Sequence, residues 1–303
     1  MVKKNNRFGS IDIIRIIAII LVIIFHYLYI VTSENSLRKL GFVGVSLFFI
    51  VSGYLLSKKY PNLEKFSLKW FLNRYIKIAS LYYLALIALV ILLGKQIYSG
   101  SLFENLSLHF LFLDFLSPNA SYGIISLAWF LIPLMGLYLL FPYLNNLMKK
   151  NSHLLFLIFY ITIAIRFLAD FNLIAYSFYA PLFYLGEFCF GILFAYNKKN
   201  PALLAGLLVI FVQPFMIFPF AIFYLIMIIN IPSNRVLSFI GANTLALFLF
   251  QEAFIAIYMG RWNIYSLDKW FALALFTVVA IILVILSKPI QRFFIKKLDK
   301  LKK

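Results

Sequence analysis

Residues 10–29 read SIDIIRIIAIILVIIFHYLY, and this apolar stretch decides the fold class. A helix needs about 20 mainly apolar residues to cross the hydrocarbon core of a bilayer. The stretch is longer than the apolar region of a secretory signal peptide, and no small-residue cleavage site follows it. The sequence therefore predicts a first transmembrane helix, over residues 11–31, that the protein retains.

The composition of the whole chain resembles that of its first span. Of the 303 residues, 64% are hydrophobic and only 13% are charged. Soluble globular proteins are about 45–50% apolar and about 25% charged, and their interiors have no room for a larger apolar share. This excludes a soluble enzyme, a disordered protein and a nucleic-acid-binding domain, despite the net charge of +18. We expect an all-α polytopic membrane protein, with residues 1–303 forming a single transmembrane domain.

Apolar runs between polar breaks predict about ten transmembrane helices in one bundle. The segment 102–116 is short and contains acidic residues, so we expect it to form an interfacial or re-entrant helix on the outer side. Pro214 and Pro219 interrupt the segment 201–231, which we expect to form two short spans. The predicted spans cover residues 11–31, 41–58, 75–94, 124–145, 152–170, 174–196, 201–213, 214–231, 236–259 and 269–287.

The distribution of basic residues predicts the orientation of the bundle. With ten spans and a cytoplasmic N-terminus, most of the 28 lysines and arginines fall on the cytoplasmic side, as the positive-inside rule requires. Nine spans would place the basic tail, residues 287–303, outside. We therefore expect both termini to be cytoplasmic, with residues 293–303 forming an amphipathic helix on the anionic inner leaflet.

The cysteine and histidine content argues against metal and disulfide chemistry. The chain has one cysteine, Cys189, and three histidines that lie far apart in the sequence. A single cysteine can form neither an intramolecular disulfide nor a CxxC site. We therefore expect no metal site.

Two polar residues of the first span are the sharpest candidates for chemistry, because charged groups at membrane depth are costly. Arg15 and His26 are eleven residues apart, which on an α-helix places them about 20° apart around the axis and about 16 Å apart along it. One helix face would carry a fixed cation near the cytoplasmic end and an imidazole, a suitable general base near neutral pH, deeper inside. Alternatively, His26 only hydrogen-bonds a neighbouring helix and Arg15 reaches the interface.

Further polar residues are predicted within other spans. Glu252 could orient the imidazole of His26 through a hydrogen bond, as a carboxylate does in a catalytic triad. Alternatively, Arg166 and Glu252, or Arg166 and Asp170, neutralise each other. Glu187 lies lower in its span and has no obvious partner in the sequence. Helical rise from the inner ends of their spans predicts that three residues lie level with His26: Trp129, Arg166 and Glu252.

Aromatic side chains are available for binding a sugar ring. The chain has 19 tyrosines and four tryptophans, and Trp129 is predicted at the depth of His26. Most such residues in membrane proteins pack in the core or mark the membrane interface. We nevertheless take Trp129 and Arg166 as candidates for substrate binding.

The segment 57–77 is predicted to be a cytoplasmic loop with six basic residues. Arg74 and Lys77 are three residues apart, and so they share one face at the base of the third span. A phosphate-bearing donor such as coenzyme A would suit this pair. The alternative is ordinary positive-inside charge in contact with anionic lipid.

Motifs spread along the chain resemble those of the acyltransferase-3 family of integral membrane acyltransferases. Arg15, ten residues and then His26 look like the hallmark of the family's first span. GFVGVSLFFIVSGYLLSKKY (41–60) resembles its glycine-flanked second span, and WFLNRYIKIASLYYL (70–84) resembles its Arg-x-x-Arg segment, with Lys77 in place of the second arginine. Two later segments also match, AWFLIPLMGLYLLFPYL (128–144) and FIGANTLALFLFQE (239–252).

Within the family, the WFL sequence at Trp129 resembles the branch that modifies simple sugars and surface polysaccharides. Two positions depart from the usual pattern. Leu134 stands where many members have glutamate, and Gln251 stands where members often have histidine. The chain therefore resembles the sugar-modifying branch, although it lacks this glutamate.

The resemblance implies a ten-span bundle that transfers an acyl group, usually acetyl from acetyl-CoA, to a hydroxyl of a sugar, polysaccharide or other cell-envelope molecule. It implies that His26 is the catalytic base and that Arg15, Arg74 and Lys77 serve the donor. The acyl-CoA is a co-substrate, and no cofactor is bound permanently. We expect the protein in a prokaryotic cytoplasmic membrane, with an extracytoplasmic partner enzyme for any second transfer step.

The sequence leaves the details of transfer open. The acyl group could pass directly to the acceptor or through an acyl-enzyme. Ser46, Ser52 and tyrosines are possible donors to the oxyanion, and the sequence does not choose among them.

The main alternative is a transporter or flippase of small envelope precursors. Pro214, Pro219 and the paired short spans at 201–231 could form broken helices of the kind that bind transported substrates. We find no inverted repeat in the sequence to accompany them. A non-catalytic membrane scaffold is the third possibility, and it predicts that Arg15 and His26 tolerate replacement.

Overall fold

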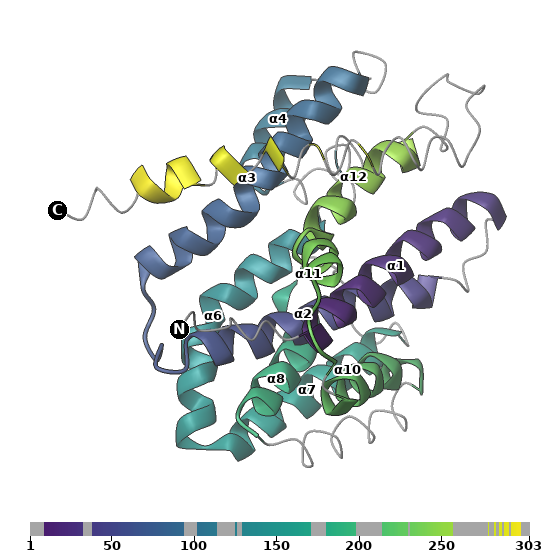
Figure 1. Cartoon of the computed structure of the whole chain (residues 1–303). Helices are drawn as coiled ribbons and strands as arrows, with labels where there is room; N and C mark the ends of the chain where they lie inside the picture. Colours follow the sequence, from purple (N-terminus) through teal and green to yellow (C-terminus); the bar gives the residue numbers. More distant parts are fainter. Residues whose placement is uncertain are drawn as a thin grey trace. The chain divides into compact units, whose positions relative to one another are not determined.

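The computed structural model describes most of the chain, and all of its regular elements there are helices (Figure 1). Among the described residues there is no strand, so the all-α fold class is confirmed. The described residues are 9–32, 38–93, 102–113, 125, 129–170, 180–197, 214–229, 231–256, 278, 282, 285–286, 288–290 and 292–297.

Contacts divide the chain into two compact units. The first unit comprises Met1–Phe25, Glu34–Phe66 and Pro133–Thr244, and the second comprises His26–Ser33, Ser67–Ile132 and Leu245–Lys303. The helices of the first unit are α1 (Gly9–Thr32, up to Phe25), α2 (Arg38–Lys59), α6 (Leu131–Lys150), α7 (Ser152–Asp170), the 3₁₀ helix η5 (Pro181–Tyr184), α8 (Leu185–Ala195), the 3₁₀ helix η7 (Pro214–Met216), α10 (Ile217–Ile229) and α11 (Arg235–Ala242). Those of the second unit are α3 (Leu68–Leu93), α4 (Leu102–Phe110) and α12 (Thr244–Ala256).

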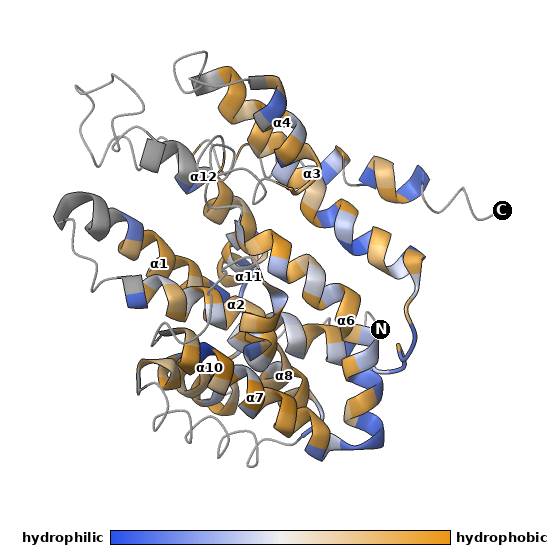
Figure 2. Ribbon diagram, turned by 180° about the vertical axis from the view of Figure 1, so that it is seen from behind, coloured by the Kyte–Doolittle hydropathy of each residue, from blue (hydrophilic) through white to orange (hydrophobic). Residues whose placement is uncertain are grey.

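Five of these helices are long and apolar enough to cross a membrane, namely α1, α2, α3, α6 and α7. Two shorter apolar helical stretches cover Pro181–Ala195 and Ile217–Ile229. Figure 2 shows hydrophobic residues along most of α7, α8 and α10, and hydrophilic residues at the C-terminal end of α6. The predicted span 201–213 and most of 269–287 lie outside the described residues, so the number of ten spans and the orientation of the termini stay predictions.

Several helix boundaries differ from the predicted ones. Helix α3 begins at Leu68, before the predicted start at residue 75, so Arg74 and Lys77 lie within a helix and not in a loop. The predicted span 236–259 is wrong as one helix, because α11 ends at Ala242 and α12 begins at Thr244. At the junction, the Asn243 side-chain amide donates to the Phe239 carbonyl at 2.6 Å. Such local side-chain bonds compete with the backbone bonds of a continuing helix.

Glycines allow α2 to contact α1 and α8 closely. A Cβ at Gly44 would lie 2.5 Å from the carbonyl oxygen of Ala18 in α1. On the other side, a Cβ at Gly53 would lie 2.2 Å from the carbonyl oxygen of Phe188, and one at Gly191 of α8 would lie 2.1 Å from that of Ile50. The backbones of α2 and α8 therefore touch, and this contact brings polar side chains of the two helices together.

In the second unit, α3 and α4 pack through aromatic and polar groups. The Tyr82 hydroxyl and His109 Nδ1 are 2.9 Å apart, and Tyr83 donates to the Phe110 carbonyl at 2.7 Å. The rings of Tyr83 and Phe110 also stack, with centroids 4.5 Å apart. Phe112, with φ of 57°, ends this turn in the left-handed region. The short helix expected within 102–116 is thus present, and its place relative to a membrane stays a prediction.

Candidate active site

Helix α1 carries Arg15 and His26 on its buried face. The helix is continuous from Gly9 to Thr32. The eleven-residue spacing therefore places Arg15 and His26 on the same face of the helix. Both side chains are partly buried. On the opposite face, Ile20 and Ile24 are 46% and 40% exposed. The buried residues that surround the positions of Arg15 and His26 on the helix are Ile11, Ile14, Ala18, Ile19 and Val22.

The first turn of α1 is held by the segment around α11. Ser10 Oγ accepts a hydrogen bond from the Ile231 amide at 2.8 Å, and Ser238 Oγ donates to Asp12 Oδ2 at 3.0 Å. A Cβ at Gly241 would lie 2.7 Å from Cβ of Asp12, so only glycine fits this contact without displacement. These contacts fix the rotation of α1 about its axis, and with it the direction in which Arg15 points.

A buried ion pair lies between α7 and α8. Arg166 NH1 donates to Glu187 Oε1, and Ser46 Oγ of α2 donates to the same oxygen at 2.9 Å. Glu187 is fully buried and Arg166 is 5% exposed. The Arg166 guanidinium also lies 5.1 Å from the centroid of the Tyr184 ring, in the geometry of a cation–π contact. Glu187, which has no obvious partner in the sequence, is therefore the partner of Arg166.

This pair leaves one buried acceptor atom unused. Glu187 Oε2 is buried and has no hydrogen-bond partner among the described residues. A buried polar atom without a partner costs about 1–3 kcal/mol, so such atoms often mark a bound water or a functional site. Ser46, in contrast, uses its only hydroxyl proton on Glu187, which removes it from the candidate donors to an oxyanion.

Four of the remaining candidates lie in the second unit, namely Arg74, Lys77, Trp129 and Glu252. Arg74 is partly buried and Lys77 is exposed on α3. Trp129 is partly buried in a 3₁₀ turn directly before α6. Glu252 belongs to α12, and Asp170 of the first unit belongs to α7. The structure does not describe the side chain of either residue. The structure thus brings Arg166 together with Glu187 and Ser46, whereas the meeting of His26 with Glu252 stays a prediction.

Gln251 is a second polar residue whose environment the sequence does not reveal. Its side chain is buried, and neither Oε1 nor Nε2 has a hydrogen-bond partner among the described residues. It directly precedes Glu252 in α12. The signal in the sequence that points to it is the departure at this position from the motif that residues 239–252 resemble.

No group of three histidine, cysteine or carboxylate side chains that could hold a metal is found within the described ranges. The single cysteine, Cys189, is a buried free thiol on α8. Neither feature assigns a metal-dependent role to these residues.

Comparison with known proteins identifies the family. The sequence model of the acyltransferase-3 family, Acyl_transf_3, described as an acyltransferase domain, matches residues 8–288. Searches of the curated proteins and of the solved structures found no match. Because the family match spans nearly the whole chain, the chain belongs to the acyltransferase-3 family and is a multi-pass membrane acyltransferase.

Proposed function

Because the chain belongs to the acyltransferase-3 family, we propose that it transfers an acetyl group from acetyl-CoA to a hydroxyl of a sugar, polysaccharide or other cell-envelope molecule. The reaction takes place in the cell membrane, with the donor reaching the protein from the cytoplasm and the acceptor from the outer side. The short WFL sequence at Trp129 favours a sugar or a surface polysaccharide as acceptor.

The observation that carries this proposal is the buried face of α1. Arg15 and His26 lie on the side of the helix that packs against protein, and the exposed isoleucines lie on the other side. A cation and an imidazole directed into a membrane protein are costly to keep there unless they act on a substrate or a partner group. A residue that merely reached the interface would be expected on the exposed side.

In the proposed reaction His26 is the general base. Its imidazole takes the proton of the acceptor hydroxyl as the oxygen attacks the carbonyl carbon of the thioester. The carbon–sulfur bond then breaks, the imidazolium returns the proton to the leaving sulfur, and the products are an ester and free CoA. Glu252 holds the imidazole in the orientation that this transfer needs.

Arg15, Arg74 and Lys77 are proposed to bind the donor. CoA carries phosphate groups, and arginine binds phosphate through two parallel hydrogen bonds, whereas lysine acts as a point charge. Ser52, on α2 and partly buried, is the remaining serine candidate for stabilising the oxyanion, because Ser46 is engaged by Glu187. Trp129 and Arg166 are proposed to contact the acceptor.

The test uses purified protein, labelled acetyl-CoA and a mixture of envelope glycans and sugars. Wild type should transfer label to a hydroxyl-bearing product, and His26→Ala should lose at least about 100-fold in rate, the usual contribution of a general base. Ile20→Ala is the matched control, because Ile20 lies on the exposed face of the same helix. A brief incubation followed by precipitation separates an acyl-enzyme, which retains label on the protein, from direct transfer.

Normal transfer by a folded His26→Ala variant would refute the role of His26. Failure of the wild type to transfer label to any acceptor, from acetyl-CoA or from longer acyl donors, would refute the proposed function itself.

A further inference from the structure

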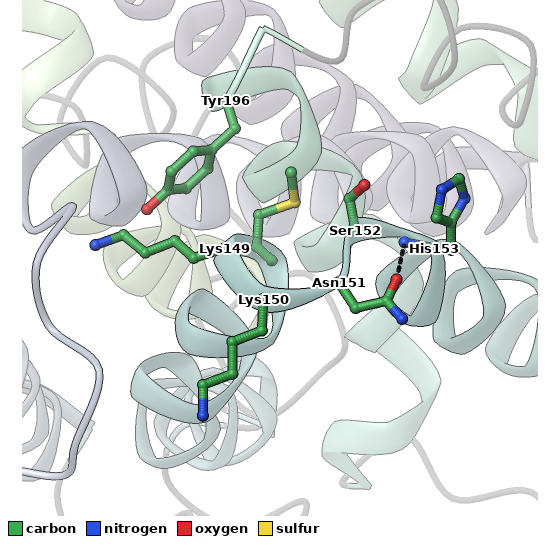
Figure 3. A pocket seen from close by; sticks show the side chains of 7 residues that line it. Lys149, Lys150, Asn151, Ser152, His153 and Tyr196 are labelled. Atoms are coloured by element: carbon green, nitrogen blue, oxygen red, sulfur yellow. Dashed lines mark hydrogen bonds between the residues drawn. The ribbon is translucent and has the colours of Figure 1, made fainter.

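The turn between α6 and α7 forms a pocket whose side chains do not converge on one ligand. Lys149 Nζ donates to Glu64 Oε1 at 2.8 Å. Asn151 Oδ1 accepts a hydrogen bond from the His153 amide at 3.0 Å, and Figure 3 shows Lys149 and His153 extending in different directions. The Gln251 side chain of α12 differs from these groups. It is buried, and both of its polar atoms lack a hydrogen-bond partner among the described residues.

Gln251 lies on the side of α12 that packs against the turn containing Trp129. It follows Phe248 by three residues, and so the two side chains share one face of the helix. The Phe248 ring contacts the Phe130 ring, with centroids 4.2 Å apart. Phe130 directly follows Trp129 in the 3₁₀ turn before α6, and all four residues belong to the second unit. The Gln251 amide is therefore on the side of α12 that faces the turn of the proposed acceptor contact.

The chemistry of the amide restricts the ligand that can satisfy it. Its Nε2 donates hydrogen bonds and its Oε1 accepts them. A phosphate or a carboxylate only accepts, and an ammonium group only donates, so each would leave one buried atom of the amide unpaired. A trans secondary amide carries its N–H and its C=O on opposite edges, and so it cannot bond to both atoms of one side chain. Two neighbouring hydroxyls, in contrast, can donate one hydrogen bond to Oε1 and accept one from Nε2.

We propose that Gln251 binds the acceptor sugar through paired hydrogen bonds to two neighbouring hydroxyls. This inference rests on the proposed acyl transfer to a sugar, and it adds a residue that selects the acceptor. Buried polar atoms without a partner are costly, and the bound sugar supplies the missing partners, so an acceptor that lacks one of the two hydroxyls is rejected. The next residue of α12 is Glu252, the proposed partner of His26. One helix thus carries the acceptor contact and the group that orients the base.

The first experiment compares the full-length wild type and Gln251→Met in detergent, with labelled acetyl-CoA and the mixture of envelope glycans and sugars. Methionine keeps the unbranched shape of glutamine and cannot donate a hydrogen bond. Loss of two hydrogen bonds should lower the transfer rate at limiting acceptor about 10- to 100-fold and leave KM for acetyl-CoA unchanged. Because the variant removes two unpaired buried atoms, its unfolding temperature without acceptor should equal or exceed that of the wild type. Leu245→Ala, on another face of α12, is the control for altered packing.

The second experiment removes neighbouring hydroxyls from the acceptors. Periodate cleaves the bond between two carbons that carry neighbouring hydroxyls, and borohydride then reduces the resulting aldehydes to separate hydroxyls. With the treated mixture the wild type should lose its advantage, and the wild type and Gln251→Met should transfer label at equal rates. Gln251→Leu replaces Gln251→Met in both comparisons if the methionine variant does not fold.

Four results would overturn the inference. Equal transfer by the wild type and a folded Gln251→Met with the untreated mixture would show that the amide does not contact the acceptor, and an undiminished advantage of the wild type with the treated mixture would exclude neighbouring hydroxyls. A raised KM for acetyl-CoA in the variant would assign the amide to the donor. A marked fall in its unfolding temperature without acceptor would show that the amide already has a partner, such as a buried water. Failure of the wild type itself to transfer label is a different result, because it refutes the proposed function and this inference with it.

Discussion

Replacement of the Arg166–Glu187 pair tests whether these residues hold the fold or act on a substrate. Both side chains are buried, and Glu187 Oε1 receives hydrogen bonds from Arg166 and from Ser46. Removing one member of a buried ion pair leaves the other charge uncompensated and costs about 3–5 kcal/mol. Arg166→Met and Glu187→Met should therefore each destabilise the protein by about that amount.

The double variant Arg166→Met, Glu187→Met should behave differently. Replacing both members of a buried pair by apolar groups of similar size is often neutral or stabilising by about 1–4 kcal/mol. We expect the double variant to regain most of the stability that each single variant loses. Ser46 loses its acceptor in the double variant, which leaves a residual cost of about 1–2 kcal/mol.

The assay is thermal unfolding in detergent, followed by transfer measurements on every variant that remains folded. A coupling free energy of at least about 2 kcal/mol between the two sites is expected, well above the error of a double-mutant cycle. Single-variant losses below about 1 kcal/mol would refute the reasoning that the pair is a desolvated ion pair. A stable double variant with full transfer activity would assign Arg166 to structure and remove it from substrate binding.

Three further predictions concern the packing and the surface. Gly53→Ala and Gly191→Ala should each cost about 1–3 kcal/mol in thermal unfolding, because the added methyl meets a backbone carbonyl of the facing helix; wild-type stability in both would contradict the contact between α2 and α8. Tyr82→Phe removes the buried hydrogen bond to His109 and should cost about 1–3 kcal/mol, and an unchanged unfolding temperature would count against this bond. The hydrogen bond and charge of Lys149 hold the pKa of Glu64 below its ordinary value of 4.5. The resulting stabilisation is therefore present above pH 4.5 and is lost as the pH falls through the lowered pKa; because the pair is solvent-exposed the effect is small, and Glu64→Gln should remove it in unfolding curves recorded against pH.

The features that the sequence predicts correctly are those that depend on a regular period or on composition. A chain that is 64% hydrophobic and has long apolar runs can form only helices or a closed barrel in a membrane, and the runs are helical. The spacing of Arg15 and His26 fixes their common face as soon as the segment is a continuous helix.

The features that the sequence misses depend on contacts between helices. Arg166 and Glu187 are separated by 21 positions and lie on different helices, so no periodicity connects them, and Glu187 has candidate partners only once α7 and α8 are placed side by side. The junction at Asn243 is missed because a local side-chain bond, not a proline, interrupts an apolar run. In both cases a polar group finds its partner through geometry that hydropathy does not encode.

The orientation of α1 depends both on the periodicity of its sequence and on its contacts with other helices. A rotation of α1 by one residue would turn its faces by about 100° and would move Arg15 and His26 away from the protein interior together. Nothing in the apolar run itself opposes such a rotation strongly, because isoleucine lies on nearly every side of the helix. Two contacts oppose the rotation. Asp12 accepts a hydrogen bond from Ser238 and packs closely against Gly241, and Gly44 of α2 approaches the carbonyl of Ala18. The spacing of Arg15 and His26 therefore sets which residues can act together, and contacts with α2 and α11 set the direction in which they act.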